Sequence, residues 1–482
     1  MLEARSHELL KILLGEVSSS WQHDLTLCRL VGRSLRRKER TLIQIDLDSK
    51  DLFWLGLLIP LCLETSDAVI VLSKEQKSHL LAKEIPILNR NGFDLIFDEG
   101  MDPPKDKKIW LIDYKSLVYA YKNDLLQSKQ VIIPYAEDFS KNLREVMSIK
   151  IQAKDWNQLI EKNPNQKDQL LSFRNNITKR LFQEQPIKVT NKQLSINKIN
   201  DLKNLCTVSS IASDSWSTFA SINTEQWSSW AKLKHKELDW DWNLVPLEPL
   251  IILKKKIKNT PIIFIESSAI KKSILKKELD MISCKLHATV RLKSTTKEEP
   301  IEIFAPNKQP LPNTEIYKQH LLEQSKRLII GISGITILLI DDEGLLLQIA
   351  SELAAEFGKR VLYEQINTPP NGIIFCKSSW WLNNYQKIPI PKQLIIGLLP
   401  IASLSAPLTA TRVEALKKQG YDWFRELLLP EAINIITKSI NPIRNCSSRV
   451  AILDGRLRSR SWGNDVLKAL IPWTPLNRLL PG

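Results

Sequence analysis

Short apolar runs alternate with helical segments along most of this chain, and this alternation constrains the fold more than any other feature. The runs are rich in Val and Ile: "TLIQI" (41–45), "AVIVLS" (68–73), "FDLIF" (93–97), "IWLID" (109–113) and "QVIIP" (130–134). Strands buried on both faces have continuous apolar sequences, and strands separated by helices belong to parallel sheets. The first part of the chain is therefore predicted to form a doubly wound α/β lobe.

A second series of the same kind follows the Pro-containing stretch "APNKQPLPN". It consists of "GITILLID", a helical segment over 344–357, "RVLYE", "NGIIFCK", "QLIIGLLP" and "RVAILDGR". The two series have no short sequence repeat in common, so they indicate a pair of lobes rather than a solenoid. A length of 482 residues, which suggests two or three domains, agrees with this division.

Residues 151–245 differ from both series, because they are polar, rich in Asn, Gln and Lys, and free of Gly. They contain the aromatic cluster Trp216, Trp227, Trp230, Trp240 and Trp242. We expect a helical insertion here. The predicted domains are thus the first part of lobe 1 (1–150), the insertion (151–245), the last part of lobe 1 (246–285) and lobe 2 (286–482).

The charge balance points to polyanionic partners. Lys and Arg outnumber Asp and Glu by 68 to 53, which gives a net charge of +15. A basic protein attracts nucleic acids, although a charge cluster is commonly only a solvated helix face. The clusters are Arg33, Arg36, Arg37, Lys38 and Arg40; Lys254, Lys255, Lys256 and Lys258; and Lys271, Lys272, Lys276 and Lys277.

Several classes of protein are disfavoured by the sequence. The six cysteines and six histidines are scattered, without a CxxC or HExxH pattern, so neither a zinc site nor a disulfide framework is indicated. The N-terminal segment carries Glu3 and Glu8, unlike a signal or transit peptide. The longest apolar runs are shorter than a bilayer span. We expect a soluble, cytoplasmic protein without a membrane partner.

Two stretches near the C-terminus carry a family resemblance: "QLIIGLLPIASLSAPLTATRVEALKKQGYDWFRELLLPEAINII" and "RVAILDGRLRSRSWGNDVLKALIPW". Their marks, in order, are Leu399 and Pro400, Pro407, the helix start at 429–432, the segment 453–456, and Trp462 with Gly463. The order of these marks resembles the second motor lobe of DinG-type, XPD-like superfamily-two DNA helicases. The resemblance implies two RecA-like lobes and places the family's arch-like helical domain at 151–245.

The residues that carry the family's phosphate chemistry are replaced at the first site. A Walker A loop needs glycines beside the phosphates, a Lys for the outer phosphates and a Ser or Thr for Mg²⁺. In the matching frame, Leu47 and Ser49 replace glycines and Asp51 replaces the hydroxyl residue, which leaves only Lys50. We interpret Lys50 as a vestigial nucleotide-binding residue.

The later motifs are also altered. Motif II of the family is Asp-Glu-Ala-His, but "VIIPYAEDF" places Pro134 and Tyr135 at the acidic positions, with Glu137 and Asp138 one turn later as the only substitutes. Ala269 stands where the Ser-Ala-Thr motif has its Thr. "WWLNNY" replaces motif V.

Motif VI becomes "TKSINPIR", with Asn441 at an arginine position and Arg444 retained. An arginine finger is worth about 10³- to 10⁵-fold in phosphoryl transfer, and Asn carries no charge to supply it.

The resemblance therefore implies a DinG-like protein that binds nucleic acid, with ATP hydrolysis and unwinding lost. The expected partners are single-stranded DNA and repair or replication proteins, and Lys254, Lys255, Lys256, Trp380 and Trp381 are the candidate contacts. No cofactor is expected, and no iron–sulfur cluster, because no cysteine lies between Cys62 and Cys206.

Two alternatives remain open. An active ATP-dependent helicase would use ATP and Mg²⁺ through Glu137 or Asp138, Lys50 and Arg444. A non-catalytic interaction scaffold would bind neither nucleotide nor nucleic acid. Aromatic residues at such spacings are also commonly core, which applies to the insertion and to Trp380 and Trp381 alike.

Overall fold

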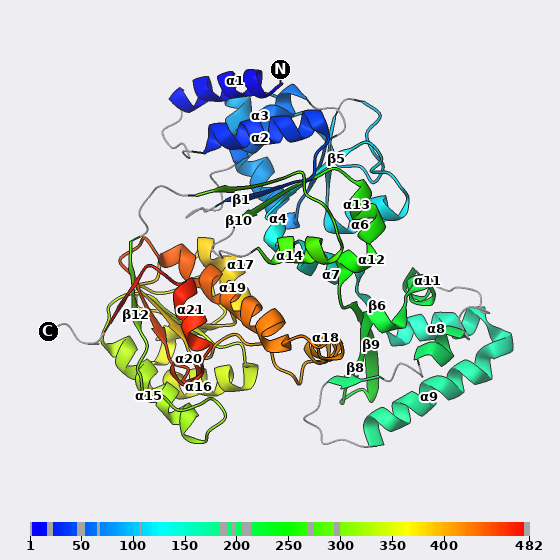
Figure 1. Cartoon of the computed structure of the whole chain (residues 1–482). Helices are drawn as coiled ribbons and strands as arrows, with labels where there is room; N and C mark the ends of the chain where they lie inside the picture. The colour runs from blue at the N-terminus through cyan, green and yellow to red at the C-terminus, as the bar shows by residue number, and fades with distance from the viewer. Residues whose placement is uncertain are drawn as a thin grey trace.

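The chain forms two α/β lobes and a smaller third body (Figure 1). The computed structural model describes residues 2–16, 23–45, 54–64, 68–106, 108–183, 191–194, 199–204, 214–267, 273–293 and 299–476. Within these residues there are two seven-stranded sheets and one four-stranded sheet. None of the helices described is both long enough and apolar enough to cross a bilayer. The cytoplasmic location stays a prediction.

Lobe 1 is a parallel sheet with the strand order β11-β1-β10-β5-β2-β4-β3. Its strands are β1 (Thr41–Ile45), β2 (Ala68–Val71), β3 (Phe97–Asp98), β4 (Ile109–Ile112), β5 (Gln130–Pro134), β10 (Ile262–Ser267) and β11 (Ala288–Leu292). Four of the five apolar runs predicted as strands are confirmed; the fifth, "FDLIF" (93–97), is irregular except for its last residue, which begins β3. Every residue of β1, β2, β4 and β5 is buried, as expected for strands covered on both faces.

Helices cover both faces of this sheet. One apolar cluster lies under α1 (Leu2–Glu16), α2 (Asp24–Arg37), α3 (Trp54–Leu63) and α5 (Ile85–Arg90), with α4 (Lys74–His79) and the π-turn Leu80–Glu84 between the last two. The other lies under α6 (Tyr114–Lys122), α7 (Phe139–Met147), α12 (Pro249–Ile252), α13 (Lys254–Asn259) and α14 (Ile274–Met281). This is the doubly wound arrangement that the alternation predicted.

The boundary between the lobes lies later than predicted. β11 pairs with β1, so lobe 1 extends through Leu292 instead of ending at residue 285. The strand was missed because its sequence, "ATVRL", mixes polar and apolar residues, and most of its residues are only partly buried at the sheet edge. An edge strand of this kind gives no continuous apolar run.

Lobe 2 is also a parallel sheet, with the order β14-β15-β13-β16-β17-β12-β18. Its strands are β12 (Ile301–Phe304), β13 (Thr336–Leu339), β14 (Val361–Tyr363), β15 (Ile373–Cys376), β16 (Gln393–Ile396), β17 (Arg449–Ile452) and β18 (Trp473–Pro475). Its helices are α15 (Ile316–Ile330), α16 (Glu343–Phe357), α17 (Ser378–Asn384), α18 (Pro407–Lys418), α19 (Leu429–Ile440), α20 (Arg456–Ser459) and α21 (Gly463–Ala469). The short strands β12 and β18 were not predicted.

The insertion is not wholly helical, which corrects the prediction. Its helices α8 (Ala153–Lys162), α9 (Lys167–Gln183) and α11 (Asp214–Ser221) pack with an antiparallel sheet of order β6-β9-β8-β7. The strands are β6 (Ile149–Ile151), β7 (Asn191–Gln193), β8 (Trp227–Lys234) and β9 (Asp239–Pro246). In "DWDWN" the tryptophans alternate with polar residues, and this period of two is typical of a strand. Helical spacing was the wrong interpretation of this segment.

The tryptophans of the insertion form its core. Trp216, Trp240 and Trp242 are at most 2% exposed and pack around Trp156, whose ring centroid lies 4.9 Å from that of Trp216 and 6.3 Å from that of Trp242. Their ring nitrogens donate to partners within the insertion, such as Trp242 Nε1 to Ser229 Oγ at 2.8 Å. Buried tryptophans with satisfied N–H groups stabilise a fold, and they are not available as stacking platforms.

The family-like residues at the end of lobe 2 have structural roles. Asp454 is fully buried, accepts from Leu399 N at 2.9 Å and pairs with Arg456 Nη2 at 2.7 Å, so it joins the ends of β16 and β17. Gly455 and Gly463 lie against backbone: a Cβ at Gly455 would meet Pro310 O at 2.4 Å, and one at Gly463 would meet Leu457 O at 1.8 Å. These positions require glycine for packing.

Candidate functional site: the carboxyl edge of lobe 1 and its contact with lobe 2

The candidate nucleotide site lies where β1, β10 and β5 end. These strands are neighbours and parallel, so their carboxyl ends meet at one edge of lobe 1, where open α/β sheets bind ligands. Lys50, with the rest of the Walker A frame, lies outside the described residues, and so does Ala269. The end of β5 and the helix that follows Lys50 can be described.

Two apolar groups stand at the end of β5. Pro134, the last residue of the strand, is buried, and Tyr135 follows it in the left-handed region with a φ of 57°. The Tyr135 ring is 8% exposed and packs edge-on against Trp54, the first residue of α3, with centroids 6.2 Å apart. At the positions of the motif II carboxylates the chain therefore has a proline and a buried aromatic ring.

The two substitute carboxylates are both engaged. Glu137 Oε2 accepts a hydrogen bond from the backbone N of Ser267, at the end of β10, at 3.2 Å. Asp138 Oδ1 forms an ion pair with Lys438 Nζ at 3.1 Å. Because Lys438 belongs to α19 of lobe 2, this ion pair joins the two lobes.

Lys438 faces three carboxylates of lobe 1. Its side chain is 13% exposed. Burial by itself would lower the pKa of this lysine, but the nearby Asp138, Glu137 and Glu266 raise it above its usual value. The ammonium group therefore stays charged where the two lobes meet, in a position that the sequence analysis did not single out.

Glu266 completes this acidic edge. It is 2% exposed at the end of β10, where its oxygens accept from Gln44 Nε2 at 2.7 Å and from Ser273 Oγ at 2.9 Å. Burial raises its pKa, and the two hydrogen bonds oppose this shift. In the sequence, Glu266 is marked only as a charged residue at the end of an apolar run, in the segment that we assigned to the approach to the Ser-Ala-Thr motif.

Arg444, the arginine kept in the motif VI stretch, bonds within lobe 2. Arg444 is 7% exposed and donates to Pro472 O at 2.8 Å and to Leu470 O at 3.0 Å, both within lobe 2. Asn441 follows the last residue of α19. Lys438 lies three positions earlier, one helical turn away, and it is this residue that extends to lobe 1. The retained Arg444 therefore serves the packing of its own lobe.

The five candidate nucleic-acid contacts do not come together. Lys254, Lys255 and Lys256 begin α13 of lobe 1, where Lys256 is paired with Asp124, while Trp380 and Trp381 lie on α17 of lobe 2. Trp381 is 1% exposed and donates to Ser439 O at 2.9 Å, so its assignment as a nucleic-acid contact is wrong. Trp380 is only partly buried, against the same core. Lys254 and Lys255 are exposed.

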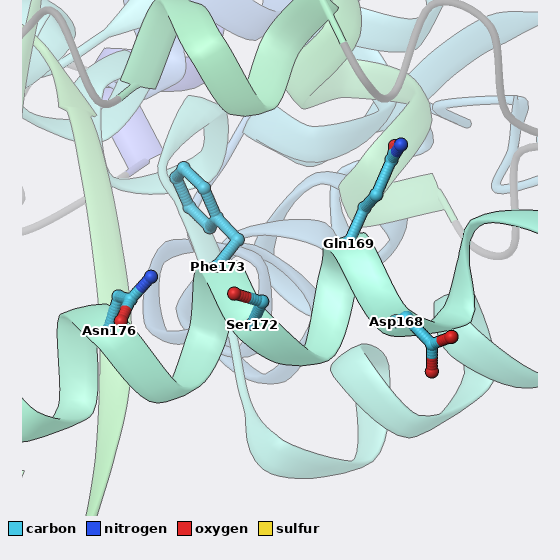
Figure 2. A pocket seen from close by; sticks show the side chains of 5 residues that line it. All are labelled: Asp168, Gln169, Ser172, Phe173 and Asn176. Atoms are coloured by element: carbon cyan, nitrogen blue, oxygen red, sulfur yellow. The ribbon is translucent and has the colours of Figure 1, made fainter.

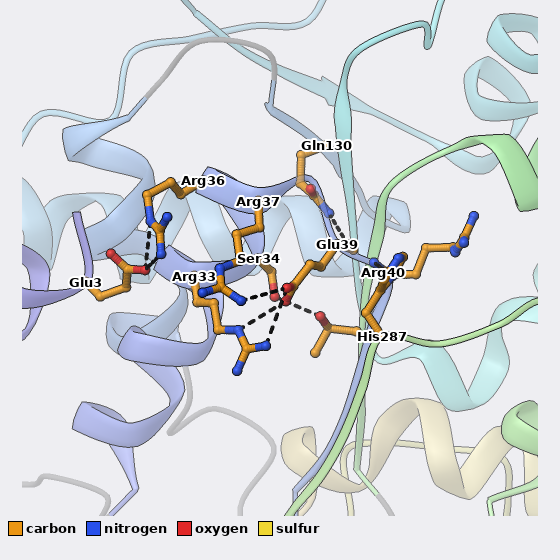
Figure 3. A network of polar contacts seen from close by, with 10 residues as sticks. Glu3, Arg33, Ser34, Arg36, Arg37, Glu39, Arg40, Gln130 and His287 are labelled. Carbon is orange, nitrogen blue, oxygen red and sulfur yellow. Dashed lines mark hydrogen bonds and ion pairs between the residues drawn. The ribbon is translucent and has the colours of Figure 1, made fainter. Parts of the chain in front are cut away.

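Several arginines of the first basic cluster are engaged in contacts within lobe 1 (Figure 3). Arg36 pairs with Glu3 at 2.7 Å, Arg33 pairs with Glu39 at 3.2 Å, and Arg40 Nε donates to Lys285 O at 2.9 Å. These contacts tie α1 to α2 and β1 to the segment before β11. The cluster therefore has a structural role.

A surface pocket on the insertion is a poor candidate for a ligand-binding site (Figure 2). Its lining residues, Asp168, Gln169, Ser172, Phe173 and Asn176, all come from α9. Binding sites bring polar groups together from several elements, and here a single helix supplies them all.

Comparison with known proteins gives two findings, while no protein-family model matches the sequence. The chain is 31% identical over 121 residues to the ATP-dependent DNA helicase YoaA of Haemophilus influenzae, and 30% identical over 123 residues to YoaA of Escherichia coli. These stretches are 24% and 25% of this chain and 19% of each relative. The chain thus matches about a fifth of the length of these relatives.

The fold is similar to that of XPD helicases. A Sulfolobus tokodaii Xpd4 structure aligns with 95% of this chain and 100% of its own, at a TM-score of 0.62 and 11% identity. An XPD helicase in the apo state aligns with 94% of this chain and 99% of its own, at a TM-score of 0.59 and 14% identity. The two RecA-like lobes predicted from the sequence are confirmed. The chain therefore has the fold of XPD helicases over nearly its whole length, and its sequence is similar to that of the YoaA helicases over about a quarter of it.

Proposed function

We propose that this chain is a nucleic-acid-binding protein with the fold of a DinG/XPD-like helicase that does not turn over ATP. The observation that carries the proposal is the ion pair between Asp138 and Lys438. It joins the substitute motif II carboxylate of lobe 1 to the motif VI helix of lobe 2. In a working motor these two elements act on the same triphosphate from opposite sides.

The other groups that ATP hydrolysis would need support this proposal. Glu137 is bonded to the backbone of β10, and Arg444 is buried within lobe 2. Hydrolysis requires a carboxylate for the Mg²⁺ ion or the attacking water, and a cation for the developing charge on the phosphate. To supply them, Asp138 and Arg444 would both have to give up their present partners. We therefore propose that neither ATP nor Mg²⁺ is a cofactor, and that no iron–sulfur cluster is present.

Binding to nucleic acid is supported by the relatives and by charge. The similar YoaA proteins are named ATP-dependent DNA helicases, and this chain has a net charge of +15. We propose single-stranded DNA as the ligand and repair or replication proteins as partners. Exposed cations attract any strand through its phosphates, whereas the 2′-hydroxyl distinguishes RNA from DNA.

The catalytic part of the proposal is tested by ATP turnover with and without single-stranded DNA. We expect no stimulated turnover above background and no binding of ATP with Mg²⁺ in calorimetry. The matched variant is Lys50→Ala, which should behave as the parent chain does. Turnover that this substitution abolishes would show an active ATPase.

The binding part is tested with a labelled single strand over a salt series. We expect the logarithm of the affinity to fall linearly with the logarithm of salt concentration, by about 0.7 per phosphate contact. An RNA strand of the same sequence shows whether DNA is preferred. Undetectable binding at low salt would support the alternative function, an interaction scaffold that does not bind nucleic acid. The ion pairs of Arg33 and Arg36 within lobe 1 favour this alternative, because they engage cations that could otherwise contact phosphates.

A further inference from the structure

Helix α18 connects lobe 2 to both other parts of the molecule. Figure 1 shows it beside β8 of the insertion. On α18, Thr411 Oγ1 lies 2.8 Å from Ser228 Oγ and accepts from Gln193 Nε2 at 3.3 Å, so it contacts β8 and β7. The next residue, Arg412, has a side chain that is only 12% exposed. This helix therefore lies at the junction of the three bodies.

Arg412 forms ion pairs on both sides of the lobe boundary. Its Nη1 donates to Glu431 Oε1 of α19 at 2.8 Å, within lobe 2. Its Nε lies 3.5 Å from Oε1 of Glu248, the lobe 1 residue that precedes α12. Burial by itself would lower the pKa of Arg412, but Glu431 and Glu248 raise it above the usual value. The guanidinium is therefore a fixed charge with one partner in each lobe.

The lobe 1 side of this contact is itself anchored. Arg144 of α7 lies 4.0 Å from Glu248 Oε2 and donates to Leu247 O at 3.0 Å. Glu278 of α14 accepts a hydrogen bond from Ser140 and faces Arg144, Arg412 and Glu248. The Arg412 guanidinium thus lies among side chains that are themselves held by hydrogen bonds and ion pairs of lobe 1, unlike a surface pair exposed to solvent.

We propose that Arg412 with Glu248, and Lys438 with Asp138, are the two partly buried ion pairs of a clasp that holds the lobes together without a nucleotide, beside the more exposed pair of Lys277 with Glu426. The clasp deepens the proposed function, because it gives the inactive motor one conformation. A single ion pair lets one lobe pivot on the other. Two pairs on different helices, α18 and α19, restrict that rotation, and partly buried pairs are screened less by salt than exposed ones.

The test is the distribution of distances between spin labels on the two lobes. The labels replace two exposed lysines, Lys115→Cys in α6 and Lys387→Cys after α17, in a chain that also carries Cys62→Ser, Cys206→Ser and Cys446→Ser. We expect one narrow distribution that ATP with Mg²⁺ does not change. The double variant Lys438→Met and Arg412→Met should broaden it at least twofold, because Met keeps a long apolar side chain and removes the charge.

Further variants separate the clasp from general destabilisation. Lys326→Met breaks the ion pair with Glu356 between α15 and α16, inside lobe 2, and should leave the distribution narrow. Lys438→Arg keeps the positive charge that faces Asp138, Glu137 and Glu266, so the distribution should stay narrow, whereas Lys438→Gln should broaden it. If Lys438 only filled space between the lobes, the uncharged Gln would keep the distribution as narrow as Arg does.

Two results would overturn the clasp: a distribution that is already broad in the labelled parent chain, or one that narrows only when ATP is added. An unchanged distribution in a double variant that unfolds cooperatively would overturn it as well. ATP turnover by a chain with a narrow, ATP-independent distribution would overturn the proposed function and leave the clasp supported. The two ideas therefore fail on different measurements.

Discussion

The carboxyl edges of the two lobes each hold an aspartate in an ion pair, but the two pairs differ. In lobe 2, Asp454 is fully buried and pairs with Arg456 of the same lobe. In lobe 1, Asp138 is partly exposed and pairs with Lys438 of the other lobe. The lobe 2 pair joins strand ends within one core, so losing it damages that core. The lobe 1 pair stabilises an arrangement of two cores that can each fold without it. The family-like segment 453–456 thus belongs to the core of lobe 2.

Substitution of Asp454 by Ala is the largest test of this comparison. It should lower the free energy of unfolding by about 3 kcal/mol, because it leaves Arg456 without its buried partner and Leu399 N without an acceptor. Urea unfolding measures the change. Lys318→Gln, which breaks an exposed pair with Glu352, is the control and should cost less than about 0.5 kcal/mol. Equal effects of the two substitutions would contradict the structural role of the lobe 2 edge.

The pH dependence of stability is the second test. Burial raises the pKa of Glu278 to about 7 from its ordinary value of 4.5, so the folded chain keeps a proton that the unfolded chain releases. Its contribution to stability is fully present below pH 4.5 and is lost as the pH rises through 7. We expect a loss of about 3 kcal/mol across this window. Glu278→Gln should flatten the pH profile of the urea midpoint, and parallel profiles would refute the assignment.

Substitution of Asp138 by Asn should have a smaller effect on unfolding, within about 1 kcal/mol. The Asp138 side chain is 41% exposed, and Glu137 and Glu266 continue to face Lys438 after the change. The measurement is again urea unfolding, beside Asp454→Ala. If Asp138→Asn lowered the free energy of unfolding as much as Asp454→Ala does, the ion pair at the lobe 1 edge would be as important for folding as the one at the lobe 2 edge, and the comparison would be wrong.

The smallest expected effect concerns the exposed lysines of α13. Lys254→Ala with Lys255→Ala should change the free energy of unfolding by less than about 0.5 kcal/mol. If both contact a strand, the salt slope of single-stranded DNA binding should fall by about 1.4, which is about 0.7 for each contact. Lys256→Ala, which removes a lysine paired with Asp124, is the matched control. An unchanged slope would remove α13 from the nucleic-acid surface.

The sequence was a good guide wherever one segment decided its own structure. The apolar runs predicted most strands of both sheets, because a strand buried on both faces needs apolar side chains at every position. It was a poor guide for the edge strands β11 and β18 and for β12 beside β18, which are short or mixed in polarity. It was also a poor guide in the insertion, where the alternating tryptophans of β9 were interpreted as helical.

The candidate site was predicted only in part. Aligning the sequence with the family motifs identified Pro134, Tyr135, Glu137 and Asn441. Such an alignment gives the position of a residue but not the direction in which its side chain points. Arg444 donates within its own lobe, and Trp381 lies in a core. Lys438, which reaches lobe 1, differed from other lysines of the sequence in no visible way.

The sequence by itself determined that this chain has two parallel sheets, since the apolar runs of their strands are a local property. Only the tertiary structure decided which charges meet. Asp138 and Lys438 are 300 positions apart, and Arg412 and Glu248 belong to different lobes. Ion pairs depend on distance in space, and neither composition nor periodicity encodes the packing of one lobe against another.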